Sequence, residues 1–123
     1  MSLVRLGATL TRISSTTYTP ILETDQRGKY QIRGIIVHNP STSAEITFTV
    51  AHTVIVDPST EVTNRLFRVV LSLQDTWTMG MLGGLILVEA DAIEPALVDR
   101  LEMNVTAEPA EALEVTVYWG LDR

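Results

Sequence analysis

The chain has 123 residues, of which 46% are hydrophobic and 20% charged, a composition typical of one folded domain with a single core. Its 15 acidic residues outnumber the 9 basic ones and give a formal net charge of −6, so direct binding of nucleic acid is disfavoured. The absence of cysteine excludes disulfides and zinc–thiolate sites, and the longest apolar run, residues 79–88, is far shorter than the ~20 residues of a membrane-spanning helix.

The first predicted strand lies at the N-terminus, where apolar and polar side chains alternate. Its apolar residues share one parity: Val4, Leu6, Ala8 and Leu10. The alternation is lost at Arg12 and Ile13, and a Ser/Thr-rich run then leads to Pro20. We therefore expect residues 1–20 to form an N-terminal strand or extended arm on a single sandwich domain over residues 21–123. Such a strand can reach a neighbouring subunit and complete its sheet.

Two strands are predicted in the first half of the domain. In residues 30–37 the apolar side chains occupy both parities toward the end, which indicates a central strand covered on both faces there. Turn-forming residues that begin at Asn39 end this strand. Residues 46–56 alternate without interruption and are followed by Pro58, which cannot donate to a sheet ladder.

The second half predicts further short strands separated by turn residues. They cover residues 67–73, 77–81, 85–88, 101–106 and 113–119, and the last two are expected to pair as a hairpin. The one helix candidate, residues 93–100, is too short to be more than marginal. The predicted fold class is all-β: an antiparallel β-sandwich or jelly roll of about eight strands with an extended N-terminal arm.

The search for an active site begins with His38 and His52, since they are the two histidines of the chain and histidine is the usual base near neutral pH. His52 falls on the apolar parity of its strand, which favours a core histidine whose ring nitrogens meet a backbone or hydroxyl partner. His38, at a strand end, is interpreted as a solvated turn residue. Neither has the closely spaced neighbours of a cupin-type metal site.

Other chemistry is equally weakly indicated. Four acidic residues could offer oxygen ligands to calcium: Asp75, Glu89, Asp91 and Glu94. They lack the ligand periodicity of a calcium loop, so a solvated acidic loop is favoured. The chain has no nucleophile elbow and no glycine-rich phosphate loop. We therefore predict no enzyme activity and no catalytic, cofactor-binding or metal-ligating residues.

The order of several segments along the chain is informative. These are LTRI (residues 10–13), TYTP (17–20), YQIRGIIVHN (30–39), AEITFTV (44–50), LILVEADAI (85–93) and LEVTVY (113–118). A strand that ends in Asn precedes a turn and an alternating strand, and an apolar strand with an acidic turn precedes the last strands. In this layout, which spans nearly the whole chain, the sequence resembles the small β-sandwich decoration or cement proteins of tailed-bacteriophage capsids.

The resemblance implies a virion structural protein, made in the host cytoplasm, that binds the outer surface of the assembled capsid. Its partners would be the major capsid protein and further copies of itself, as a homotrimer, with no nucleic acid or membrane involved. The alternatives are a phage tail, neck or receptor-binding component, and a small carbohydrate-binding module on the same fold.

The residues expected at such interfaces fall in three places. The N-terminal strand contributes Leu3, Val4, Leu6, Leu10 and Ile13, and Tyr18 follows it. Trp77, Met79 and Met81 form a short alternating piece, for which a strand facing the core and an exposed patch that meets another subunit both remain open.

Overall fold

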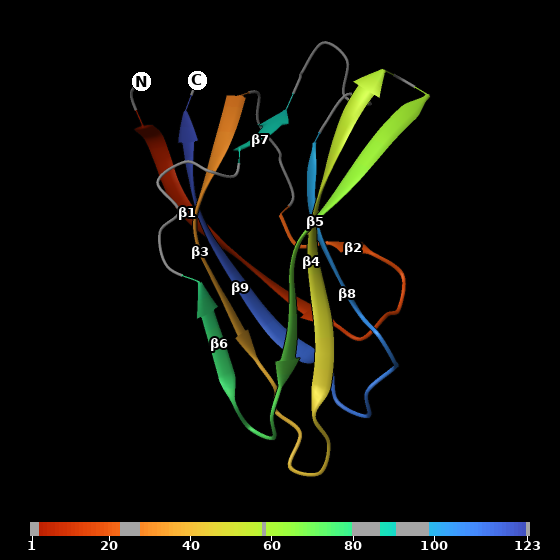
Figure 1. The fold of residues 1–123 in the computed structure, drawn as a ribbon. Coiled ribbons are helices and arrows are strands. Elements are labelled where there is room, and N and C mark those ends of the chain that lie inside the picture. Colours follow the sequence, from red (N-terminus) through yellow and green to blue (C-terminus); the bar gives the residue numbers. More distant parts are fainter. Residues whose placement is uncertain (1–2, 23–27, 58, 80–86, 91–98, 123) are drawn as a thin grey trace.

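The structure, a computed structural model, describes residues 3–22, 28–57, 59–79, 87–90 and 99–122. Two antiparallel sheets pack face to face (Figure 1), which confirms the predicted all-β sandwich. Sheet A has the order β1 (Leu3–Ile13), β9 (Leu113–Asp122), β3 (Gly28–His38) and β6 (Thr76–Met79), and β7 (Leu87–Ala90) also pairs with β3. Sheet B has the order β2 (Thr19–Pro20), β8 (Arg100–Val105), β4 (Ile46–Asp57) and β5 (Thr60–Leu71).

The core lies between the two sheets and is built from alternate residues of their strands. On β8 and β9 every apolar side chain of one parity is buried: Leu101, Met103, Val105, Leu113, Val115, Val117, Trp119 and Leu121. Tyr30 of β3 meets Trp119 edge to face, with ring centroids 5.1 Å apart. The parity predicted for residues 101–106 and 113–119 is therefore the parity of burial.

A bulge in β3 explains why its apolar residues change parity. Ile32 pairs with Trp119 and Gly34 with Tyr118, so Arg33 is an extra residue with no counterpart on β9. The residues that face the core are Tyr30 and Ile32 before the bulge, and Ile35 and Val37 after it. The expected central position is confirmed, because β3 lies between β9 and β6. The expected cover on both faces is wrong at Ile36, which is half-exposed.

The predicted hairpin of the last two strands is also wrong. β8 pairs with β2 and β4 in sheet B, whereas β9 pairs with β1 and β3 in sheet A. The connecting residues 106–112 thus cross from one sheet to the other. Alternation shows that both segments are strands with one covered face, but it carries no information on which sheet each strand joins.

The N-terminal segment is a strand of the sandwich. From Arg5 to Ile13, β1 pairs residue by residue with β9 of the same chain, and only Val4 interrupts the register. Immediately after β1 the chain crosses to sheet B, where the Val105 amide donates to the Ser15 carbonyl at 3.0 Å. Residues 3–13 and 19–20, which belong to the segment expected as an N-terminal strand or arm, are therefore paired within the domain.

Two strand boundaries differ from expectation. β5 begins at Thr60 because its hairpin with β4 continues to the Asp57 pair, and it ends at Leu71, so that Leu73 is exposed in the following turn. Most of the helix candidate, residues 93–98, lies outside the described residues, and Arg100 already begins β8.

Candidate interaction surface

The apolar parity of β1 faces solvent. Leu6 is 64% exposed and Leu10 is 77% exposed, whereas Ile13, on the other parity, is 1% exposed. Gly7, Thr9 and Thr11, which share the parity of Ile13, are half-buried. The amphipathic pattern that usually directs apolar side chains into a core is therefore reversed in this strand.

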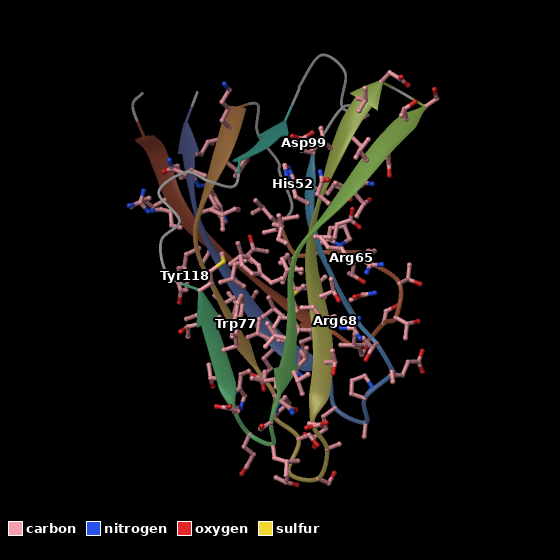
Figure 2. The ribbon with its side chains drawn as sticks, viewed as in Figure 1. His52, Arg65, Arg68, Trp77, Asp99 and Tyr118 are labelled. Atoms are coloured by element: carbon pink, nitrogen blue, oxygen red, sulfur yellow. The ribbon has the colours of Figure 1, made fainter. Side chains whose placement is uncertain are left out.

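The neighbouring strand extends this apolar surface. Ala8 pairs with Tyr118 of β9, so both side chains lie on the same face of sheet A. Tyr118 is 45% exposed and lies on the side of sheet A that is turned away from sheet B (Figure 2). We call the surface formed by Leu6, Ala8, Leu10 and Tyr118 the outer apolar face. Among the residues whose side chains are described, the other exposed large apolar ones lie on the β4–β5 hairpin and the turn after it: Val56, Val62, Val70 and Leu73.

The structure separates the residues that the sequence grouped as an interface. Leu6 and Leu10 lie on the outer apolar face, but Ile13 belongs to the core, because it occupies the inner parity where β1 ends. Tyr18 is half-buried in the connection between β1 and β2. Leu3 and Val4 lie in β1, but their side chains are outside the described part of the structure, as is the whole of Met81.

Trp77 and Met79 are half-buried and pack against the core. The Trp77 ring lies between Phe48 and Phe67, with centroid distances of 5.6 Å to each. These contacts join β6 of sheet A to β4 and β5 of sheet B (Figure 2). Of the two interpretations left open for this strand, the contacts support the core.

His52 is less buried than its parity suggested, since its side chain is 19% exposed. Its Nε2 atom lies 3.7 Å from Oδ2 of Asp99 and has no hydrogen-bond partner among the described residues, contrary to the expected backbone or hydroxyl partner. Asp99 also accepts a hydrogen bond from the Ile55 amide at 3.3 Å. The carboxylate thus links the start of β8 to the far half of β4, where the two strands separate.

The turn after β3 is organised by Asn39, a residue whose role the sequence did not indicate beyond turn formation. Asn39 is fully buried, and its Nδ2 donates to the carbonyls of Ala44, Leu71 and Ser72 at 3.0, 3.3 and 3.1 Å. Its Oδ1 accepts from the Ser41 amide at 3.0 Å. One side chain therefore joins the β3–β4 turn to the β5–β6 turn.

His38 stands at the end of β3, as expected, and is half-exposed. Its Nδ1 lies 2.9 Å from Oγ1 of Thr76, its pairing partner on β6. Beside these turns, a hollow of about 460 Å³ is lined by Ser43, Glu45, Ser72 and Leu73. Glu45 is the only ionisable residue of this lining, which offers little for acid–base chemistry.

The outer face of sheet B carries charged residues. Arg100 Nη2 contacts Glu61 Oε2 at 2.7 Å, and its Nε donates to Glu102 Oε1 at 3.2 Å. The hydrogen bond to Glu61, followed by that to Glu102, raises the pKa of Arg100. Arg65 and Arg68 are exposed on β5 opposite Ala51 and Thr49, on the outside of the sandwich (Figure 2).

The acidic residues considered for calcium do not form a described cluster. Asp75 is exposed, and its carboxylate accepts from the Thr76 amide within its own turn. The Glu89 side chain, Asp91 and Glu94 lie outside the described residues. In the part of the chain that the structure describes, no three His, Asp or Glu side chains converge as metal ligands.

Comparisons with known proteins do not identify a binding partner for the outer apolar face. Within the described ranges, no helix has the length and apolar character needed to cross a membrane. Searches of protein-family models, of curated proteins and of solved structures found no match to this chain.

Proposed function

We propose that this protein is a non-enzymatic virion component that binds the outer surface of an assembled phage capsid and stabilises it. The observation that carries the proposal is the outer apolar face. Leu6 and Leu10 point away from the core of their own domain, so they add little to its stability. Apolar side chains gathered on a rigid sheet gain free energy when a partner removes them from water.

The capsid as partner comes from the resemblance of the sequence layout to decoration proteins, and the sheet geometry suits it. On β9, Gly120 lies opposite Leu6 and Thr116 opposite Leu10, so the residues beside the two leucines are small, and Tyr118 between them adds a large aromatic side chain to the face. A component that binds the assembled shell but not its separated subunits raises shell stability by its binding free energy. Several linked copies would add avidity without a new type of contact.

The binding and assembly role is also consistent with the two histidines. His38 lies beside Thr76 at a strand end, and His52 lies beside Asp99 where two strands separate. In both cases the contacts of the histidine are with residues of neighbouring strands or strand ends, as expected for a structural side chain of the sandwich.

Cosedimentation with capsids of the phage that encodes the chain tests the proposal. The wild type should pellet with capsids, and Leu6→Ser/Leu10→Ser should bind more than tenfold more weakly, because each buried Leu contributes about 1.5–3 kcal/mol and about 1.4 kcal/mol is tenfold. The matched control is Val62→Ser/Val70→Ser, which alters exposed apolar residues of the β4–β5 hairpin and should bind like the wild type. Binding to tails alone, or to glycans without capsid binding, would overturn the proposal.

A further inference from the structure

The edges of the two sheets are protected against further strand pairing to very different degrees. In sheet B, β2 has two residues and ends in Pro20, and β5 is interrupted by Leu66, an extra residue without a counterpart on β4. On the far edge of sheet A, β6 and β7 have four residues each. Short strands, proline and bulges are the usual devices that prevent edge pairing.

β1 lacks most of these devices, since its one irregularity is at Val4, near its start. It has 11 residues, no proline and no lysine, and its register with β9 is regular from Arg5 to Ile13. In the described structure it pairs with β9 on one side only. Alternate backbone amides and carbonyls on its other side therefore point away from the sheet. The two most exposed large apolar side chains among the described residues, Leu10 and Leu6, lie on this same strand.

The sequence of β1 is compatible with pairing to itself. If two copies run antiparallel with Ala8 opposite Ala8, each Leu6 faces a Leu10, and each Leu3 position faces an Ile13 position. Arg5 faces Thr11, and Arg12 faces Val4. Like charges are therefore not opposed: at about 3.4 Å per residue, the two Arg5 residues lie roughly 20 Å apart along the strands and the two Arg12 residues roughly 27 Å apart. Both spacings exceed the Debye length of about 8 Å at physiological salt. Arg5 of one copy and Arg12 of the other lie only one position apart along the strands, but they point to opposite faces of the sheet.

We propose that β1 pairs antiparallel with β1 of a second copy, about a two-fold axis through Ala8. The two A sheets then become one continuous sheet, and the side chains of Leu6 and Leu10 from both copies meet on its outer surface. The axis is perpendicular to the sheet, so both outer apolar faces point in the same direction. The pairing uses only the strand edge and does not depend on whether the partner of that face is a capsid.

The dimer extends the docking surface while using a small interface. A contact confined to one strand edge buries less than the roughly 1,200–2,000 Å² of a standard stable interface, so the dimer should dissociate on dilution. A shell that binds both outer faces at once would stabilise the dimer by avidity. Two-fold pairing of β1 edges produces a dimer and leaves no free β1 edge for a third copy. The proposed dimer therefore differs from the homotrimer implied by the sequence resemblance.

Cysteine crosslinking tests the register directly, because the native chain contains no cysteine. In the proposed dimer the Ala8 Cα atoms lie about 4.5–5.5 Å apart, within disulfide range. Ala8→Cys should therefore become a covalent dimer on mild oxidation or with a short bis-maleimide. The matched control is Arg12→Cys, which places an exposed thiol on the same strand and the same face but far from its counterpart, and it should remain uncrosslinked.

Light scattering after size-exclusion chromatography tests the association of the unmodified protein over a range of concentrations. The wild type should shift from 13.6 kDa toward twice that mass as concentration rises. Leu6→Lys/Leu10→Lys should stay monomeric with an unchanged circular dichroism spectrum, and in the Ala8→Cys background it should abolish crosslinking. A wild type that is monomeric at every concentration, a trimer, or equal crosslinking of Ala8→Cys and Arg12→Cys would each overturn the inference.

Discussion

The indole of Trp119 packs directly on the backbone of Gly7: a Cβ atom added to Gly7 would lie 2.4 Å from Cζ2 of that ring. Trp119 is 6% exposed, and its Nε1 donates to Oγ1 of Thr9 at 3.1 Å. The guanidinium of Arg5, which lies on β1 like Gly7, is 5.4 Å from the centroid of the Trp119 ring. The Trp119 side chain therefore adds contacts to the backbone pairing with β9 that keeps the N-terminal strand in the sheet.

Gly7→Ala is expected to destabilise the fold by about 1–2 kcal/mol. Overpacking against a buried ring costs about 1–3 kcal/mol, and the reduced entropy of the unfolded chain returns at most about 1 kcal/mol. Urea denaturation followed by circular dichroism measures the change. In the Trp119→Phe background the same substitution should cost less than half as much, because Cζ2 and Cη2, the two ring atoms closest to the added Cβ, are absent. An equal cost in both backgrounds would show that the close contact is not the cause.

The alternation of residues 46–56 predicted the existence and extent of β4 correctly, but it did not predict which residues are buried: in the second half Ala51 and Thr53 are buried, whereas Val56 is exposed. The same reasoning could not orient β1. Parity groups Leu6 with Leu10, but whether that group faces the core depends on Gly7, whose missing side chain makes room for Trp119 from a distant part of the chain. Of the interface residues predicted on this strand, Leu6 and Leu10 are therefore exposed on the outer apolar face, whereas Ile13 lies in the core.

Other features were hidden for comparable reasons. The extra residue Arg33 shifts the core-facing side chains of β3 from even to odd positions. In the sequence, apolar residues then occur at both parities, which is also the pattern of a strand buried on both faces. The separation of β8 and β9 into different sheets depends on pairings far apart in sequence. Asn39 looked like an ordinary turn residue, because its partners Leu71 and Ser72 lie 32 and 33 positions away.

Replacement of Asn39 should be among the most damaging polar substitutions in the chain. Asn39→Ala removes four hydrogen bonds at a fully buried site and leaves their backbone partners unsatisfied, so we expect a loss of about 3 kcal/mol. Asn39→Asp should be at least as harmful, since a carboxylate would face three carbonyl oxygens. Asn64→Ala, at an exposed position on β5, serves as the control and should change stability by less than about 0.5 kcal/mol. A loss below 1 kcal/mol for Asn39→Ala would contradict the role assigned to this side chain.

The tip of the β4–β5 hairpin contains an aspartate with a lowered pKa. Asp57 Oδ1 accepts hydrogen bonds from the Ser59 amide and the Ser59 hydroxyl, both at 2.9 Å, and these bonds lower the pKa of Asp57 below its ordinary value of 3.8. Because the folded-state pKa is depressed, the stabilisation is present above the unfolded-state value and is lost as pH falls through the folded-state value. Carbon-detected NMR titration should find the Asp57 pKa below 3.8 in the wild type and closer to it in Ser59→Ala. An identical Asp57 titration in both proteins would refute the contribution of the hydroxyl.

The two carboxylates that contact Arg100 should differ sharply in their importance, because they differ in exposure. The Glu61 side chain is 51% exposed, and that of Glu102, which lies beside Pro20 of β2, is 9% exposed. Glu61→Gln should therefore cost less than about 0.5 kcal/mol, as is usual for surface ion pairs. Arg100→Met should cost about 2–3 kcal/mol, because it leaves the buried Glu102 carboxylate without its cation.

The decisive comparison is the double variant Arg100→Met/Glu102→Leu. If the cost of Arg100→Met arises from an uncompensated buried charge, removing that charge should recover at least about 1 kcal/mol, and the double variant should be more stable than the single one. Thermal and urea unfolding of the wild type, Arg100→Met, Glu102→Leu and the double variant give this coupling. A double variant less stable than Arg100→Met would mean that the Glu102 carboxylate stabilises sheet B through contacts other than its ion pair with Arg100.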